Sequence, residues 1–124
     1  MHQVRQNYDV LKAMYDAGKE MTSTDIVNAV PDLMQSTTIT VMRTMKNKGV
    51  IEPGGLQSTR RGFVQQYRPT EKAREALMEY FTEMYRSFKD AVLPADMCAV
   101  ILEKTQPSGE ELDKLSKILE KCEK

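Results

Sequence analysis

The sequence predicts a mainly α (α+β) fold, in which three helices precede a two-stranded ribbon and three more helices follow it. Apolar residues recur at helical spacing on both sides of the ribbon. Two runs with strand character, VIEP and FVQQYRP, flank the stretch GGLQSTRRG, which has the glycines and polar residues of a hairpin loop. This order of elements is the first basis for a functional assignment.

The composition is that of an ordinary globular protein. The chain has 124 residues, of which 40% are hydrophobic and 29% charged, and its formal net charge is zero. No apolar run approaches the roughly 20 residues that a membrane-spanning helix needs. The N-terminal stretch MHQVRQNYDV is too polar for a signal peptide. We therefore expect a cytoplasmic protein with no membrane partner.

Two helices open the chain. Residues 3–17 place apolar side chains on one helical face, and Gly18 is expected to end this helix in a left-handed conformation. Thr22 or Ser23 can cap a second helix, which Pro31 ends after about two turns. Its inward residues are Ile26, Val27 and Val30. The turn DLMQ then leads into a third helix, as in a helix-turn-helix unit.

The third helix is expected from about Ser36 to Gly49 and has two different faces. With residues about 100° apart, its buried stripe consists of Thr38, Val41, Met42 and Met45. The opposite face has no acidic residue, whereas a solvated helix face usually mixes Glu with Lys. Short donors, acceptors and a guanidinium are groups that read base edges in the DNA major groove. The candidate DNA contacts are Ser36, Thr37, Ile39, Thr40, Arg43, Thr44, Lys46, Asn47 and Lys48.

A basic hairpin is expected after this helix. VIEP predicts a strand of roughly three residues, GGLQSTRRG a flexible loop, and FVQQYRP the returning strand. The two faces of the returning strand hold Phe63, Gln65 and Tyr67, and Val64 and Gln66, respectively. Residues 36–72 carry seven Lys/Arg against two Asp/Glu, although the whole chain is neutral. The candidate DNA-backbone contacts are Arg60 and Arg61 at the tip and Arg68 on the returning strand.

The helices after the ribbon are expected to form a dimer. Thr70 caps a long helix, Pro94 precedes the next, and Ser108 begins a capping box for the last. Their apolar stripes are too wide to be buried within one chain, and a twofold dimer is the commonest solution. We therefore predict a DNA-binding domain over residues 1–70 and a helical dimerisation region over 71–124. The predicted dimer residues are Leu77, Tyr80, Phe81, Met84, Tyr85, Phe88, Leu112, Leu115 and Leu119.

Three helices followed by a two-stranded ribbon form the layout of a winged helix-turn-helix protein. Together with the acid-free helix face and the basic hairpin, this layout predicts a protein that binds double-stranded DNA. A twofold dimer would place two recognition helices about 34 Å apart, one turn of DNA. A winged-helix module that binds proteins and has no DNA role stays open as an alternative.

Four stretches resemble the penicillinase-repressor family of winged-helix proteins (the BlaI/MecI/CopY group). They are DIVNAV, STTITVMRTMKNKGVI, RRGFVQQYRPT and SGEELDKLSKILEK, and the resemblance covers roughly residues 8–122. It implies a homodimeric transcriptional repressor that binds a dyad operator. It also implies groove contacts by Thr37, Thr40, Arg43 and Thr44, and backbone contacts by the tip arginines.

The resemblance leaves the inducing signal open. Members that respond to antibiotics are cleaved at an Asn-Phe pair, whereas the corresponding stretch here is AVILEK, with Val100–Ile101 at that position. Copper-responsive members end in a cysteine motif, of which only Cys122 is present. TEKAREAL is equally similar to ligand-responsive MarR and PadR regulators, so a small-molecule signal and a protease-linked signal both stay open.

Enzymatic and metal chemistry is not indicated. The chain has one histidine and two cysteines, no phosphate-binding glycine loop before a helix, and no acid pair with a base. We therefore predict no catalytic residue, no metal and no cofactor. Cys98 and Cys122 are expected to be buried, reduced thiols.

Overall fold

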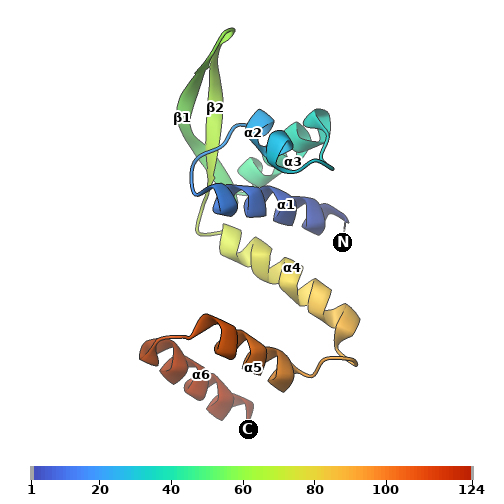
Figure 1. Cartoon of the computed structure of the whole chain (residues 1–124), viewed down its shortest axis with the longest axis vertical. Coiled ribbons are helices and arrows are strands. Elements are labelled where there is room, and N and C mark those ends of the chain that lie inside the picture. Colours follow the sequence, from blue (N-terminus) through green and yellow to red (C-terminus); the bar gives the residue numbers. More distant parts are fainter. Residues whose placement is uncertain (1, 124) are drawn as a thin grey trace. The chain divides into compact units, whose positions relative to one another are not determined.

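A computed structural model describes residues 2–123 of the chain, with side chains from residue 5 onward. Six helices and one two-stranded antiparallel sheet follow one another in the predicted order (Figure 1). The elements are α1 (His2–Ala17), α2 (Ser23–Ala29), α3 (Gln35–Asn47), β1 (Ile51–Thr59), β2 (Gly62–Pro69), α4 (Ala73–Phe88), α5 (Pro94–Thr105) and α6 (Gly109–Cys122). The predicted winged-helix layout is confirmed.

The chain forms two compact units, Met1–Arg86 and Ser87–Lys124. The core of the first unit lies where α1, α2 and α3 meet the base of the ribbon and the start of α4. Its most deeply buried large side chains are Val10, Leu11, Met14, Ile26, Met45 and Ile51. Helix α1 also contacts α4 through the rings of Tyr8 and Tyr80, which stack with their centroids 4.1 Å apart. This core fixes the positions of α3 and of the ribbon relative to each other.

The ends of several helices follow the sequence signals. Gly18 has a φ of 65° and ends α1, as predicted. Thr22 caps α2: its hydroxyl accepts the Asp25 N–H, and the Asp25 carboxylate accepts the Thr22 N–H. Ser108 likewise accepts the Glu111 N–H at the start of α6.

Helix α4 begins later than predicted. The Thr70 hydroxyl accepts the Lys72 N–H, but it also donates to the carbonyl of Gly49, and α4 starts only at Ala73. The Thr70 N–H donates to the Val50 carbonyl over 2.9 Å. Thr70 therefore ties the end of the ribbon back to its beginning, a long-range contact that helix propensity alone does not reveal.

The ribbon is longer than predicted. The predicted three-residue strand and flexible loop are wrong, because β1 spans nine residues and pairs with β2 as far as Thr59 and Gly62. Only Arg60 and Arg61 lie in the turn. Gly54 and Gly55 instead occupy a bulge between Pro53 and Leu56. Since neither face of the outer ribbon packs on the core, its strands carry no apolar alternation that the sequence could reveal.

A third strand-like contact was not predicted. Met21, between α1 and α2, exchanges two backbone hydrogen bonds with Tyr67 of β2, at 3.0 and 2.9 Å. A single paired residue leaves no periodic signal in the sequence. The contact anchors the returning strand to the helical core.

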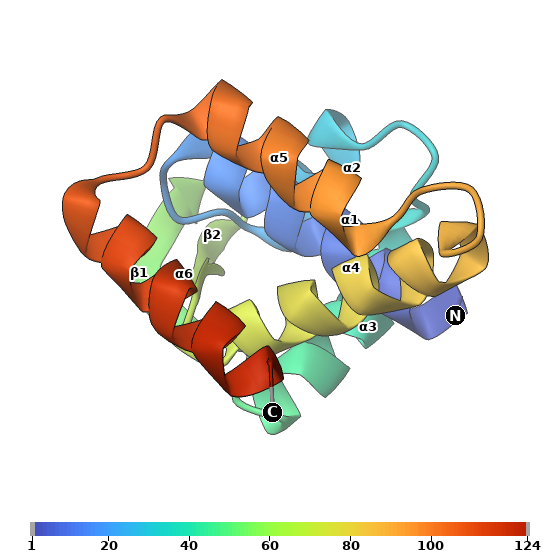
Figure 2. The same cartoon turned by 90° about the horizontal axis from the view of Figure 1, so that it is seen from below.

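The second unit contains α5 and α6. Figures 1 and 2 show that α6 reverses direction after the short connection that follows α5. Many of its apolar side chains are exposed in the single chain, among them Met97, Val100, Ile101, Leu112, Ile118 and Leu119. Cys98 and Cys122 are also exposed, so the expected burial of these thiols is wrong for the single chain. Burial was inferred from residue type, which does not tell which face of a helix its neighbours cover.

The described residues contain neither a candidate membrane-spanning helix nor a cluster of metal ligands. None of the helices in this part of the chain is both long and apolar enough to cross a membrane. Among the same residues, no three His, Cys, Asp or Glu side chains come together as metal ligands would.

Thr38 provides a test of the core. Its side chain is fully buried, and its hydroxyl has no hydrogen-bond partner in the described part of the chain. Because a buried unpaired hydroxyl destabilises the folded state, we expect Thr38→Val to raise the free energy of unfolding by about 1 kcal/mol. Urea unfolding at a fixed protein concentration measures this change.

Thr38→Ser is the matched control, because it keeps the hydroxyl and removes the methyl group. We expect this variant to lose about 1 kcal/mol of stability. A less stable Thr38→Val protein would contradict the burial assigned to this site.

Candidate nucleic-acid interface

Helix α3 has the two faces that the sequence predicts. Thr38, Val41, Met42 and Met45 are at most 8% exposed and form the inner stripe. Thr37 and Thr44 are half-buried at its margin. The remaining predicted contact residues of this helix region are all exposed: Ser36, Ile39, Thr40, Arg43, Lys46, Asn47 and Lys48. Burial therefore confirms the division of the helix, while the DNA contacts themselves stay a prediction.

Two hydroxyls on this face are oriented by the helix itself. Thr40 donates to the Ser36 carbonyl and Thr44 donates to the Thr40 carbonyl, both over 3.1 Å. Each hydroxyl therefore donates its hydrogen within the helix, and its oxygen lone pairs stay available as acceptors. In a DNA major groove, such oxygens match the amino groups of adenine and cytosine.

A small hollow lies beside the outer face of α3. It has a volume of about 200 Å³ and joins α3 to the start of α2 and to β2. Its lining residues are Ser23, Ile39, Met42, Arg43, Lys46 and Tyr67. Ser23 and Tyr67 were not predicted as site residues, because their proximity to Arg43 depends on how α2 and β2 pack. The lining thus combines two cations and two hydroxyl-bearing side chains with apolar ones, a composition that suits an anionic, partly apolar surface.

The ribbon tip presents two arginines. A bond network orders the turn: the Thr59 hydroxyl donates to the Gly62 carbonyl and accepts the Arg61 N–H. Gly62 has a φ of 119°, which a residue with a side chain adopts only with strain. Arg60 and Arg61 are exposed, and no carboxylate of the described residues pairs with them. Their charges are available to an outside anion.

Arg68 has a different environment from the tip arginines. Its guanidinium donates to Glu52 over 2.8 Å and to Glu20 over 3.1 Å. The hydrogen bond to Glu52, followed by that to Glu20, raises the pKa of the Arg68 guanidinium above its ordinary value. Its charge is thus compensated within the protein, at the base of the ribbon. This geometry supports a positioning role for Arg68.

Glu20 connects the first helices to the ribbon. One oxygen of its carboxylate accepts the Gly55 N–H over 2.7 Å, and the other pairs with Arg68. The hydrogen bond from Gly55, together with Arg68, holds the pKa of the Glu20 carboxyl below its ordinary value. Sequence reasoning missed Glu20, because it lies in a short connection and contacts the ribbon 35 residues further along the chain.

Gly54 leaves room for this carboxylate. A Cβ atom at Gly54 would lie 2.3 Å from the Glu20 carboxyl group. The bulge between Pro53 and Leu56 is further held by Gln65, whose amide donates to the carbonyls of Gly54 and Gly55. The glycine pair thus allows a close approach at the base of the ribbon, where the sequence indicated only a flexible loop.

The predicted dimer residues divide into two groups. Leu77 packs on the core of its own chain, and the rings of Tyr80 and Phe81 contact Tyr8 of α1. Tyr85 and Leu115 are half-buried. Phe81 is nevertheless 44% exposed, and the remaining side chains are similarly or more exposed: Met84 42%, Phe88 58%, Leu112 46% and Leu119 62%. In the single chain, each of the two units therefore has exposed apolar side chains that a partner could cover.

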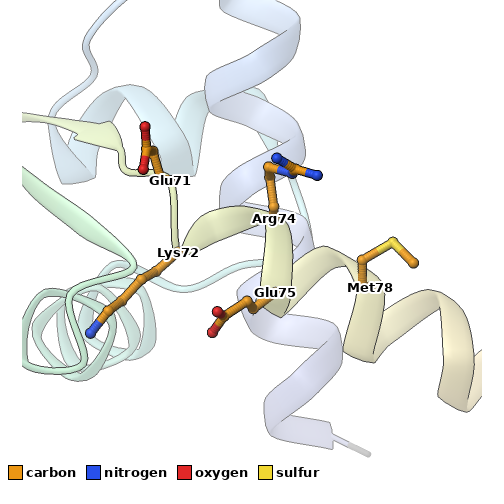
Figure 3. Close-up of a pocket in the computed structure, with 5 residues that line it drawn as sticks. All are labelled: Glu71, Lys72, Arg74, Glu75 and Met78. Carbon is orange, nitrogen blue, oxygen red and sulfur yellow. The ribbon is translucent and has the colours of Figure 1, made fainter. Parts of the chain in front are cut away.

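Another hollow lies at the start of α4 and is lined by Glu71, Lys72, Arg74, Glu75 and Met78. Figure 3 shows that these side chains leave the chain in different directions. Both signs of charge are present, and no group of polar atoms converges on one point.

Comparison with known proteins identifies the family. The family described as "Penicillinase repressor" matches residues 5–121. The chain therefore belongs to the penicillinase repressor family of winged-helix transcriptional regulators, which is a family of repressors and not of enzymes. The resemblance seen in the sequence is confirmed over nearly the whole chain. No curated protein matched the sequence.

Solved structures share the fold. BldR from Sulfolobus solfataricus has a TM-score of 0.53 and 19% identity, with 94% of this chain and 73% of that chain covered. A PadR family regulator from Clostridium difficile R20291 has a TM-score of 0.52 and 15% identity, covering 68% and 91%. BpsR from Bordetella bronchiseptica, whose DNA binding is regulated by 6-hydroxynicotinic acid, has a TM-score of 0.50 and 21% identity, covering 82% and 78%.

The Glu20 contact predicts a pH dependence of stability. Because its pKa is lower in the folded protein, the Glu20 charge stabilises the fold above the unfolded value of about 4.3, and this effect is lost as pH falls through the lower, folded pKa. We expect Glu20→Gln to melt below wild type at pH 7, with a difference that shrinks below about pH 4.3. Glu79→Gln, on the exposed face of α4, is the control. A difference that does not depend on pH would contradict the assignment.

Gly54→Ala tests the same contact sterically. We expect the added methyl group to displace the Glu20 carboxylate, so that the Gly55 N–H loses its acceptor and exchanges with solvent faster. Amide hydrogen exchange measures the effect. Gly109→Ala is the matched control, since a Cβ there meets nothing within 4 Å. Unchanged protection at Gly55 would show that Glu20 does not hold the ribbon.

Proposed function

We propose that this member of the penicillinase repressor family represses transcription in the cytoplasm by binding, as a homodimer, a double-stranded DNA operator with twofold symmetry. Helix α3 enters the major groove, and the tip of the ribbon contacts the DNA backbone. The observation that carries the proposal is the exposed, acid-free face of α3 together with Arg60 and Arg61, which no carboxylate of the described residues neutralises.

Each group on α3 has a task in this proposal. Arg43 pairs with guanine through two hydrogen bonds, and the Thr40 and Thr44 oxygens accept from amino groups of bases. Ile39 contacts a thymine methyl group. The peripheral groups position the helix on phosphates and sugars, which fixes its register without reading sequence. These positioning residues are Ser36, Thr37, Lys46, Asn47 and Lys48.

The hollow beside α3 supports the proposed docking. Ser23 and Tyr67 line this hollow together with Arg43 and Lys46, and both side chains carry a hydroxyl group. The Ser23 oxygen accepts from Gln35, so its own hydrogen is free to bond a phosphate. We assign Ser23 and Tyr67 to backbone contacts next to the base-reading residues.

Exposed apolar side chains in each of the two units support the proposed dimer. Met84, Phe88, Leu112 and Leu119 are each more than 40% exposed in the single chain. A twofold partner covers such side chains with the same residues on both chains. The two copies of α3 then lie one turn of DNA apart, about 34 Å, so the operator is a palindrome.

A protein-binding module without a DNA role would be favoured if the arginines of α3 and of the ribbon were held in salt bridges within the chain. Arg68 fits that description, but Arg43, Arg60 and Arg61 do not. For the release signal, a small molecule and a protease-linked signal are the two alternatives, and the first would act by binding the folded protein. A ligand screen by melting temperature tests this point, because a ligand that binds only the native state raises Tm.

Selection of duplexes from a random-sequence pool tests the function. We expect the wild-type protein to enrich palindromic sequences with half-sites about 10 base pairs apart. Arg43→Ala is expected to weaken binding to the selected duplex by roughly tenfold to a hundredfold and to relax the preference at one base pair of each half-site.

Arg86→Ala is the matched control, because Arg86 lies on α4 and pairs with Glu83. We expect it to bind as wild type does. Enrichment of no sequence by the wild-type protein would overturn the proposed function. Equal binding by Arg43→Ala would overturn only the role given to that residue.

A further inference from the structure

Two large apolar side chains on the ribbon lie outside the hydrophobic core. Phe63 is 73% exposed and Leu56 is 61% exposed. Phe63 lies opposite Ser58 in the β ladder, and Leu56 lies opposite Gln65. Since residues two apart share a strand face, Phe63 and Leu56 lie on the same face of the ribbon. They form an apolar surface outside the core.

The place of Phe63 near the ribbon tip restricts what can cover it. It follows Gly62 directly, and Arg60 and Arg61 form the turn just before it. The outer ribbon projects beyond α1, α2 and α3 (Figure 1). Any partner that covers Phe63 therefore also meets the two uncompensated positive charges of Arg60 and Arg61.

The charges of Arg60 and Arg61 restrict which kind of partner can cover Phe63. If two copies of the ribbon covered each other's Phe63, four guanidinium groups would come close together, which like-charge repulsion opposes. A polyanion with an apolar interior is favoured instead. The DNA minor groove has this character, because phosphates line its edges while sugars and base edges form its walls and floor.

The width of the minor groove limits which part of the ribbon can enter it. The minor groove is about 6 Å wide, whereas paired strands already lie about 4.8 Å apart before their side chains are added. The whole ribbon is therefore too wide for the groove, but a single ring at the tip can enter it. Several minor-groove proteins insert an apolar side chain in this way.

We propose that Phe63 is a DNA-contacting residue that inserts its ring into the minor groove beside the site read by α3. Arg60 and Arg61 hold the phosphates on either side, and Leu56 covers the neighbouring sugars. This inference rests on the proposed function and extends it. The ribbon then adds to the DNA affinity in two ways: through an apolar contact that does not depend on salt and through its charges, whose contribution does.

Salt dependence separates the two parts. Loss of a phosphate contact reduces the slope of log Kd against log salt by about 0.9 per contact, whereas loss of an apolar contact leaves the slope unchanged. The probe is the duplex enriched by the wild-type protein, with a fluorescent label. Its dissociation constant is measured by anisotropy at several salt concentrations for each full-length variant.

We expect Phe63→Ser to weaken binding by roughly tenfold to a hundredfold at every salt concentration, with an unchanged slope. Phe63→Leu is expected to lose less, because it keeps an apolar side chain. Val64→Ser, at the adjacent position on the opposite face and 39% exposed, is the control and is expected to bind within about twofold of wild type. Arg60→Ala/Arg61→Ala is expected to reduce the slope by about 2.

Several outcomes would overturn the inference. Binding by Phe63→Ser within twofold of wild type would show that the ring makes no contact. A changed slope would show that Phe63 acts through the arginines, and a changed oligomeric state would show that a second copy covers it. If Phe63→Ser fails to fold, the other two variants decide. The inference is then overturned if Phe63→Leu binds the duplex as tightly as wild type while Val64→Ser binds it more weakly. Failure of the wild-type protein to enrich any duplex is a different result and removes the proposed function as well.

Discussion

The burial of one face of α3 is the constraint on which the rest of this structure depends. Because successive residues turn by about 100° around a helix, burial of Thr38, Met42 and Met45 places Thr40 and Arg43 outward. The same helix then sets the position of the ribbon. Gly49 turns the chain with a φ of 77°, and the Val50 N–H donates to the Met45 carbonyl over 2.9 Å. The exposed face of α3 and the position of the ribbon therefore both depend on the packing of α3 in the core.

The base and the tip of the ribbon use arginine for opposite purposes. Arg68 at the base is paired with Glu20 and Glu52, and it stabilises the local geometry. Arg60 and Arg61 at the tip have no such partners among the residues that the structure describes. Thr70, Met21 and Glu20 all contact the ribbon near its base. An anchored base and an unneutralised tip are what a DNA-contacting arm requires, since the charges must be both positioned and available.

The sequence predicted those features that repeat along the chain or depend on a local signal. The buried stripe of α3 follows from its period, and Gly18, Thr22 and Ser108 act within one turn of their helices. The missed features depend on tertiary contacts. The paired segment Leu56–Thr59 was predicted as part of a loop because its faces carry no apolar alternation. The Met21–Tyr67 pair and the Glu20 carboxylate each join residues distant in the chain, for which one sequence contains no local signal. Ser23 and Tyr67 were missed as site residues for the same reason.

The central claim is that one continuous surface, made of the outer face of α3 and the tip of the ribbon, binds DNA. Backbone amide chemical shifts of the labelled protein, recorded while the enriched duplex is added, test it most directly. The account predicts the largest changes along Ser36–Lys48 and at residues 59–63, with small changes in α5 and α6. Changes confined to residues 87–123, or centred on the hollow at the start of α4, would contradict it.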